Sequence, residues 1–248
     1  MIMTTTQYTA LLLDADDTLL DFRAAEHAAL GALFHRMGFE LDDATRELYA
    51  AVNRQLWAEY ERGEIDRERL TGTRFGVLFE KLGRDVDGVA IDAAYREELG
   101  QQHQLVEGAL EVCGKLRGRF RLYIVSNGVY TTQVPRLRDS GLAAQMDGVF
   151  ISERVGHAKP SPLFFDHVMS EIGIERGKAL IVGDSLASDI RGGSGAGIDT
   201  CWFNPTASPR DENIKPTYEI ASLDELLSLL LPDAALRTDR SGSPCGLR

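Results

Sequence analysis

Residues 8 to 19 read Tyr-Thr-Ala-Leu-Leu-Leu-Asp-Ala-Asp-Asp-Thr-Leu. The apolar run that ends at Leu13 predicts a short buried strand, and the acidic residues after it predict a polar turn. Open parallel sheets bind their ligands beyond the carboxyl ends of the strands. If the rest of the chain supplies such a sheet, this stretch forms both its first strand and the first part of a binding site.

A block of helices is expected after this strand. Apolar residues recur at the spacing of one helix face, as in Phe75, Phe79 and Leu82 at i, i+4 and i+7. Stripes of this kind indicate core packing, and we assign them no chemistry. We expect four helices, near residues 24–37, 43–61, 66–82 and 89–103.

Strands and helices alternate from Gly108 onward, which favours a mostly parallel, Rossmann-like α/β sheet with helices on both faces. The first strand is then distant in sequence from its partners, so the helical block is an insertion. We predict a core from 1–22 and 105–236, an inserted four-helix cap from 23–104, and a disordered polar tail from 237–248. The later strands are expected near residues 121–127, 148–152, 178–184, 200–204 and 218–221.

The composition limits the partners. The chain has 27 basic and 38 acidic residues, a net charge of −11 that disfavours binding to nucleic acid. The longest apolar runs are too short to cross a bilayer, and the start of the chain shows no signal peptide, so we expect a cytoplasmic protein without a membrane partner. A small anionic substrate would need a local cation. The oligomeric state is left open between monomer and homodimer.

Polar residues follow four of the expected strands. Asp14 and Asp16 follow the first strand, and Ser126-Asn127-Gly128 closes the second. Lys159 lies beyond the third, and a segment with Asp184 and Asp189 follows the fourth. Because these strand ends meet at one edge of a parallel sheet, the side chains are expected to converge.

Clustered carboxylates repel one another and need a cation between them. Oxygen ligands without His or Cys suit Mg²⁺, and Asp14 and Asp184 are the expected side-chain ligands. A carboxylate beside the metal can also attack phosphorus, which makes Asp14 the expected nucleophile. Asp16 is placed to protonate the leaving oxygen and later to take a proton from water.

Two further groups complete the expected site. Ser126 and Lys159 would hold the phosphoryl oxygens as charge spreads over them, and Asp189 would orient Lys159 or a metal-bound water. Each segment alone is a weak pattern, and only their order at successive strand ends carries the prediction. The glycine-rich run 192–197 fits no phosphate-loop pattern and is interpreted as close packing at a helix start.

These four segments resemble the motifs of the haloacid dehalogenase (HAD) superfamily, and the helical insertion resembles the cap of its subfamily I. The resemblance implies that the backbone carbonyl of Asp16 is a further Mg²⁺ ligand and that the first strand is central in the sheet. The same motifs contain Thr18, Asn127 and Gly128, which are expected to contact substrate. Haloacid dehalogenases lack an acid at the position of Asp16, so its presence here implies phosphoryl transfer.

Further stretches of both cap and core carry a closer resemblance: residues 49–53, 56–57, 63–65, 151–153, 155–156 and 200–204. They are similar to the house-cleaning pyrimidine 5′-nucleotidases of this superfamily. This resemblance implies a substrate among the nucleoside monophosphates, including non-standard pyrimidine ones, with Asn53, Trp57 and Arg74 as candidates for the roof of the pocket.

The sequence therefore predicts a magnesium-dependent phosphomonoesterase that forms an aspartyl phosphate. A phosphatase for a sugar or sugar-acid phosphate would have the same catalytic residues, and only the cap could distinguish it. The same fold could also carry a phosphomutase or a non-catalytic binding protein. Turnover that depends on magnesium would exclude the binding protein.

Overall fold

The computed structural model describes residues 7–231, and a six-stranded sheet lies at its centre. Every neighbouring pair of strands is parallel, and β1 lies between β2 and β4 in the order β3-β2-β1-β4-β5-β6. The predicted parallel sheet with a central first strand is therefore confirmed. The strands are β1 (Ala10–Leu13), β2 (Arg121–Ser126), β3 (Gly148–Ile151), β4 (Ala179–Gly183), β5 (Asp199–Phe203) and β6 (Tyr218–Ile220).

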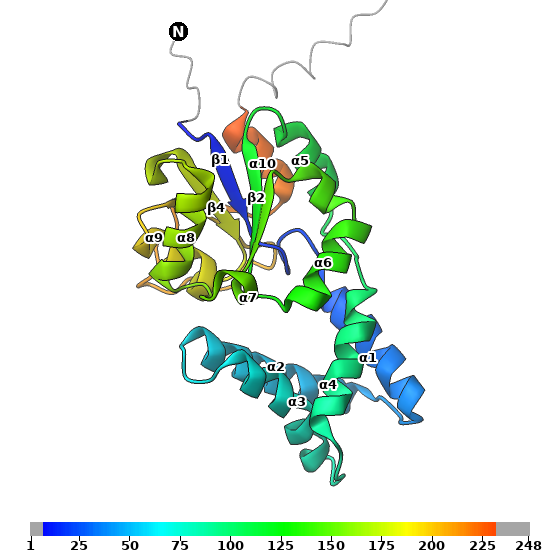
Figure 1. Ribbon diagram of the computed structural model, residues 1–248. Helices are drawn as coiled ribbons and strands as arrows, with labels where there is room; N and C mark the ends of the chain where they lie inside the picture. Colours follow the sequence, from blue (N-terminus) through cyan, green and yellow to red (C-terminus); the bar gives the residue numbers. More distant parts are fainter. Residues whose placement is uncertain (1–6, 232–248) are drawn as a thin grey trace, which may run out of the picture.

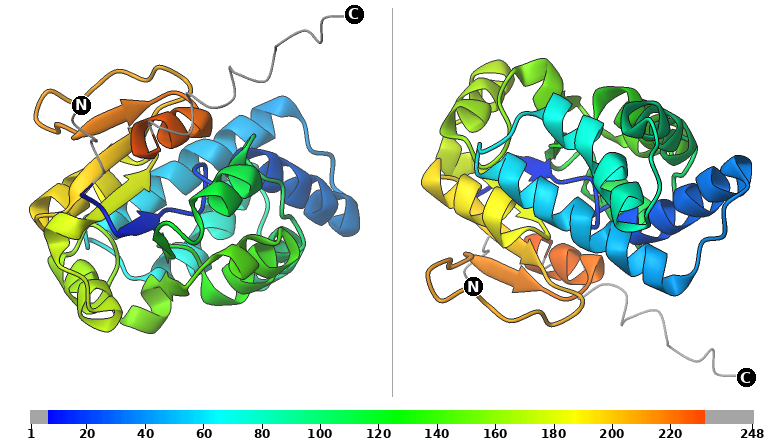
Figure 2. Two further views of the ribbon diagram at one scale, coloured as in Figure 1. Left: turned by 90° about the horizontal axis from the view of Figure 1, so that it is seen from above. Right: turned by 90° about the horizontal axis from the view of Figure 1, so that it is seen from below.

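Helices pack on both faces of the sheet, as predicted (Figure 1 and Figure 2). One face is covered by α5 (Ala109–Leu116), α6 (Tyr130–Asp139) and α10 (Leu223–Leu230), and the other by α8 (Pro162–Ile172) and α9 (Arg191–Gly195). The remaining short elements of the core are η1 (Leu142–Gln145), α7 (Ser152–Val155), η2 (Arg176–Lys178) and the π-helical turn η3 (Leu186–Ile190).

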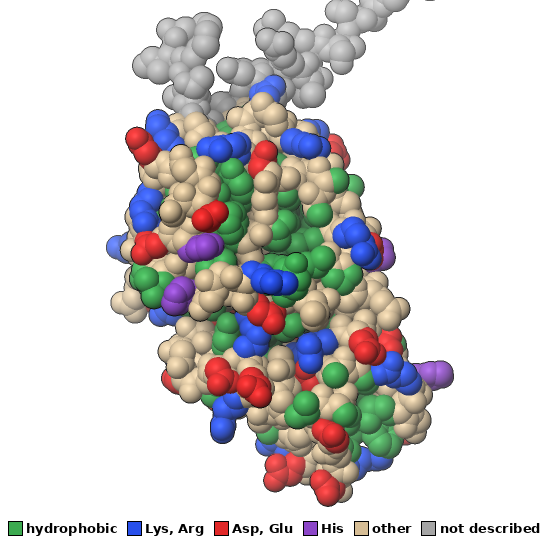
Figure 3. Space-filling model, in the orientation of Figure 1, with side chains coloured by type: hydrophobic (Ala, Val, Ile, Leu, Met, Phe, Trp, Pro, Cys, Tyr) green, Lys and Arg blue, Asp and Glu red, His purple; other side chains and the backbone are tan. Residues whose placement is uncertain are grey.

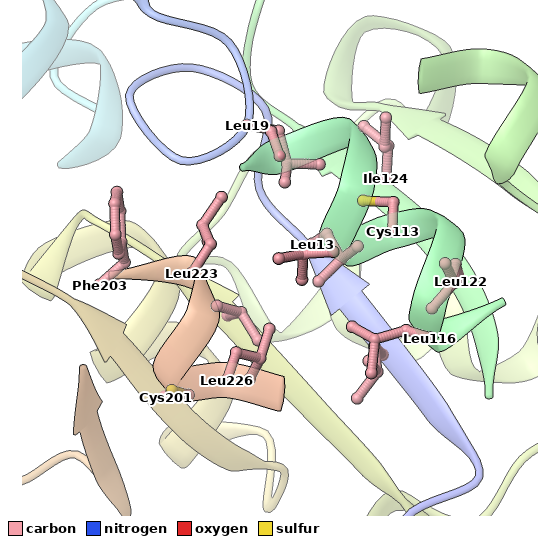
Figure 4. Packing of buried hydrophobic residues seen from close by; sticks show 14 of the residues in the cluster. Leu13, Leu19, Cys113, Leu116, Leu122, Ile124, Cys201, Phe203, Leu223 and Leu226 are labelled. Carbon is pink, nitrogen blue, oxygen red and sulfur yellow. The ribbon is translucent and has the colours of Figure 1, made fainter. Parts of the chain in front are cut away.

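Strand β1 divides its side chains between two apolar cores. Leu11 and Leu13 enter one core, whereas Ala10 and Leu12 enter the other, because successive side chains of a strand point to opposite faces. Figure 4 shows the first core, in which Leu13 faces side chains of α5 and α10. All four side chains are at most 1% exposed. The central strand is thus fixed from both sides, and so is the loop that follows it.

Four helices between β1 and α5 form a second layer, which we call the cap. They are α1 (Phe22–Met37), α2 (Asp43–Glu61), α3 (Arg67–Lys81) and α4 (Gly88–Gly100), and the sequence predicted each of them to within a few residues. The cap has its own core, with Phe34, Phe75 and Phe79 completely or almost completely buried. In Figure 1, β1 runs toward the cap, so the carboxyl ends of the strands face it.

Two paired linkers join the cap to the sheet layer. The backbone N–H of Asp21 donates to the carbonyl of Gln104 (2.9 Å), and that of Val106 donates to the carbonyl of Leu19 (3.0 Å). The chain therefore leaves and re-enters the sheet layer at one place.

No helix within residues 7–231 is long and apolar enough to span a membrane. Figure 3 shows acidic and basic side chains interspersed over the face drawn, including the level where cap and core meet. The tail predicted at 237–248 lies outside the described residues.

Most of the glycine-rich run lies in α9, which packs directly on the sheet. A Cβ at Gly193 would lie 2.5 Å from Cγ2 of Ile181 and 3.1 Å from Cγ2 of Thr200, whereas a Cβ at Gly195 would have nothing within 4 Å. Close packing therefore explains Gly193 without any phosphate contact.

We predict that Gly193→Ala lowers the free energy of unfolding by about 1–3 kcal/mol, because the added methyl group overpacks the core. Gly195→Ala is the matched control and is expected to leave stability unchanged or to raise it by up to about 1 kcal/mol. Denaturant unfolding of both variants measures this. Equal stabilities would show that α9 does not pack as described.

Candidate active site

The strand ends and the cap enclose a cavity of about 270 Å³. Most of its lining residues come from the loops after β1, β2 and β4, and three come from α1 and α2 of the cap. The lining residues are Asp14, Asp16, Asp17, Phe22, Trp57, Glu61, Ser126, Asn127, Gly128, Lys159, Asp184, Ser185, Ser188 and Asp189.

Asp14 continues β1 directly into this cavity. Its backbone N–H donates to the carbonyl of Val182 (2.9 Å), so the sheet fixes its position. Its Oδ1 accepts a hydrogen bond from Nζ of Lys159 (2.6 Å), and its Oδ2 accepts one from Oγ1 of Thr18 (3.2 Å). Thr18 is completely buried and also accepts from the backbone N–H of Asp184 (3.1 Å). Thr18 was expected to contact substrate, but it does not line the cavity and instead holds Asp14 by its hydrogen bond to Oδ2.

Lys159 uses all three of its donors within the site. Nζ donates to Oδ1 of Asp14 (2.6 Å), to Oδ1 of Asp189 (2.6 Å) and to the carbonyl of Val125 (2.7 Å). Burial alone would lower the pKa of Lys159, but the two carboxylates hold that pKa above its ordinary value. The lysine is therefore a permanent cation between two of the predicted acidic residues.

One ammonium does not neutralise the whole acidic cluster. Oxygens of Asp14, Asp184 and Asp189 all lie within 4.8 Å of one another. Burial raises the pKa of Asp14 to about 7 in spite of Lys159, and burial together with the charges of Asp14 and Asp189 raises that of Asp184 well above its ordinary value. Three oxygen donors that lack a second counter-charge are chemically suited to a hard divalent cation.

The loop after β2 contacts both Lys159 and α6. Asn127 exchanges two hydrogen bonds with the backbone of Lys159 (2.9 and 2.8 Å), which fixes the lysine loop. Oγ of Ser126 accepts from the backbone N–H of Gly128 (3.0 Å) and from Nε2 of Gln133 (2.9 Å). A Cβ at Gly128 would lie only 2.5 Å from Cγ of Gln133, so this position requires glycine.

Asp16 also lines the cavity, but its carboxylate is held by α6. Oδ1 accepts from Nη1 of Arg136 (2.6 Å), and Oδ2 accepts from Nε2 of Gln133 (2.5 Å). Neither partner was predicted from the sequence. The spacing of Gln133 and Arg136 at i and i+3 indicates one helix face, yet nothing local shows that this face meets a loop about 120 residues earlier.

The three cap residues expected in the pocket roof have different places. Trp57 lines the cavity. Arg74 is buried and pairs with Asp92 (2.5 Å), and it lines only a smaller adjoining cavity. Asn53 lies inside the cap, where it accepts from Arg74 (3.2 Å) and donates to Glu26 (3.0 Å). Asn53 therefore organises the cap and does not face the cavity.

The cap also supplies two groups that sequence reasoning missed. Glu61 lines the cavity, where burial and the charge of Asp189 raise its pKa to about 7. Nη2 of Arg67 donates to the carbonyl of Asn127 (2.9 Å) and to Oγ of Ser152 (2.6 Å), so it connects α3 to the core.

Comparisons with known proteins show what the chain is similar to. The sequence model of the haloacid dehalogenase-like hydrolases matches residues 8–197. The chain is similar to the HAD-hydrolase YfnB of Bacillus subtilis, with 43% identity over 225 residues, or 90% of this chain and 96% of that protein. A crystal structure of YfnB bound to magnesium has a TM-score of 0.88 at 42% identity, and the match covers 91% of this chain and 100% of that one.

Two similar proteins are pyrimidine 5′-nucleotidases. PynA of Streptococcus pneumoniae is 40% identical over 225 residues, which is 90% of this chain and 95% of PynA. YjjG of Escherichia coli is 34% identical over 221 residues, which is 89% of this chain and 96% of YjjG. The similarity thus extends over the cap as well as the core.

The raised pKa values predict how stability depends on pH when no divalent cation is present. Asp14 and Asp184 bind protons more tightly in the folded chain than in the unfolded one, so they stabilise the fold at acid pH. This contribution is lost as the pH rises toward about 7, the folded pKa of Asp14. Asp184→Asn should therefore gain stability relative to the original chain between acid and neutral pH.

Urea unfolding in EDTA at a series of pH values measures this difference. Glu171→Gln removes an exposed carboxylate at the end of α8, outside the cavity, and serves as the control with no such gain. Parallel pH profiles for Asp184→Asn and the original chain would contradict the assignment.

Proposed function

The chain belongs to the haloacid dehalogenase-like hydrolases, and on that premise we propose that it is a magnesium-dependent pyrimidine 5′-nucleotidase that acts through an aspartyl phosphate on Asp14. One observation carries the proposal. The Asp14 carboxylate lies 2.6 Å from the buried ammonium of Lys159 and within 4.8 Å of oxygens of Asp184 and Asp189. A nucleophile of this kind is supported only where cations offset its repulsion from phosphate.

In the proposed first step, a carboxylate oxygen of Asp14 attacks phosphorus and the bond from phosphorus to the ester oxygen breaks. Asp16 gives its proton to the departing oxygen, which leaves as the hydroxyl of a nucleoside. Ser126 and Lys159 hold phosphoryl oxygens as charge develops on them. To do so, Lys159 exchanges one of its three present acceptors for substrate.

In the proposed second step, water attacks the phosphorus of the aspartyl phosphate. Asp16 takes a proton from that water, and the bond from phosphorus to Asp14 breaks. Inorganic phosphate leaves, the Asp14 carboxylate is restored, and Asp16 is again protonated. Asp189 keeps Lys159 in place throughout, because it shares the ammonium at 2.6 Å.

Magnesium fits the donor set of this chain. The carboxylates of Asp14 and Asp184 and the backbone carbonyl of Asp16 would hold it, with Asp189 beside them. When bound, the ion supplies positive charge that screens the carboxylates from one another and from phosphate. The raised pKa values of Asp14 and Asp184 support this assignment, because a cation would allow both groups to ionise at neutral pH.

The nucleotide assignment rests on PynA and YjjG, which are pyrimidine 5′-nucleotidases and cover nearly the whole chain. Trp57 supports it from the cap side, since an indole ring on the cavity offers a flat apolar surface to a base. Sugar and sugar-acid phosphates are the alternative substrates to be compared, because the same core residues would hydrolyse any of these esters.

We predict that the chain releases phosphate from uridine and thymidine 5′-monophosphates faster than from sugar phosphates. The test is a phosphate-release screen across both sets in kcat/KM. EDTA should abolish release and magnesium restore it. Asp14→Asn should lower kcat by about 10⁴-fold or more, the scale on which removal of a nucleophile acts.

Glu171→Gln, the exposed carboxylate variant, should keep full activity. Faster release from sugar phosphates would reject the nucleotide assignment alone. Undiminished release from Asp14→Asn would reject the mechanism.

A further inference from the structure

Two buried side chains of α6 hold both oxygens of Asp16. Arg136 and Gln133 are each 1% exposed, whereas the side chain of Asp16, which they bind, is 29% exposed and lines the cavity. Two donors on one carboxylate fix the direction in which it points, because each of its oxygens must face its own donor. The orientation of Asp16 is thus set by α6 and not by its own loop.

The amide of Gln133 links Asp16 to the second motif. Nε2 donates both to Oδ2 of Asp16 (2.5 Å) and to Oγ of Ser126 (2.9 Å), while Oε1 accepts from Nη1 of Arg136 (2.8 Å). Every polar atom of the amide has a partner, which also settles its orientation. Gly128 leaves the space that this amide occupies.

Arg136 also connects this cluster to the cap. Its Nε donates to the carbonyl of Gln102 (2.9 Å), just beyond the end of α4, and its guanidinium lies 5.8 Å from the ring centre of Phe22 at the start of α1. Helix α4 runs close to α6, where a Cβ at Gly100 would lie 3.6 Å from Cγ of Pro135. One guanidinium therefore contacts Asp16 and both ends of the inserted segment.

We propose that Arg136 is the positioning residue for Asp16: it fixes the direction of the acid/base carboxylate while it is itself bonded to the linker after α4 at Gln102. This inference rests on the proposed function. When substrate binds, Oδ2 of Asp16 exchanges its bond with Gln133 for the leaving oxygen, while Oδ1 keeps its bond with Arg136. A protonated carboxyl can accept through one oxygen and donate through the other, so this geometry suits proton transfer.

Two substrates with different leaving groups can distinguish a residue that positions the acid from a residue that only supports the fold. A nucleoside leaves as an alkoxide that needs a proton, whereas p-nitrophenolate departs without one. The value of kcat/KM reports the steps up to phosphoryl transfer to Asp14. A misplaced acid is therefore expected to lower kcat/KM for the nucleotide and to leave that for p-nitrophenyl phosphate unchanged. The ratio of the two kcat/KM values is also independent of the fraction of folded enzyme, so partial misfolding cancels.

The experiment measures this ratio for uridine 5′-monophosphate and p-nitrophenyl phosphate. Arg136→Met should lower it by about tenfold to a hundredfold. This is at or below the lower end of the roughly 10²–10⁴-fold that general acid–base catalysis contributes, because Asp16 is still present but no longer held in place. Asp16→Asn should lower it at least as much, and Arg136→Lys should recover part of the loss. Arg138→Met is the control, because Arg138 lies on the same helix, is 70% exposed and pairs only with its neighbour Asp139 within the described residues.

Magnesium affinity by calorimetry should be the same in Arg136→Met and in the original chain. An unchanged ratio in Arg136→Met, or a ratio that falls equally in Arg138→Met, would overturn the inference, and so would a loss of magnesium affinity. If the original chain hydrolyses only p-nitrophenyl phosphate and another alkyl phosphate of the screen, the nucleotide assignment fails. The same ratio measured with that alkyl ester then still decides the role of Arg136.

Discussion

The site depends on one buried ammonium. Nζ of Lys159 lies between the carboxylates of Asp14 and Asp189 and the carbonyl of Val125, so it joins the segments after β1 and β4 to strand β2. Removal of this charge would leave two buried carboxylates facing each other, which is strongly unfavourable. The same ammonium leaves Asp184 without a counter-charge. An acidic cluster of this kind is chemically suited to a divalent cation.

The cap completes this environment from outside the sheet. It brings Trp57 and Glu61 to the cavity, and it contacts the core through Arg67 at the loop after β2 and through Arg136 at the linker after α4. These polar contacts lie at the boundary, whereas the apolar cores of cap and sheet are separate. Polar boundaries of this kind permit relative motion, and the YfnB structure bound to magnesium reveals interdomain movement in that protein.

The sequence was most informative where a pattern is local. The apolar run 10–13, the helical stripes of the cap and the order of Asp14, Ser126, Lys159 and Asp184 all depend on short segments and on the rule that strand ends converge. Asn53 was misplaced because a helical stripe does not reveal whether a polar residue faces a cavity or another helix. Gln133 and Arg136 were missed because their partner, Asp16, becomes a neighbour only through the fold.

The most direct test of the mechanism is to find where phosphate is attached. Enzyme mixed with substrate and quenched within one turnover is treated with borohydride, which reduces an acyl phosphate to an alcohol, and is then mapped by peptide mass spectrometry. The mechanism predicts homoserine at residue 14 and unmodified aspartate at 16, 184 and 189. Reduction at another residue, or none while phosphate is being released, would contradict it.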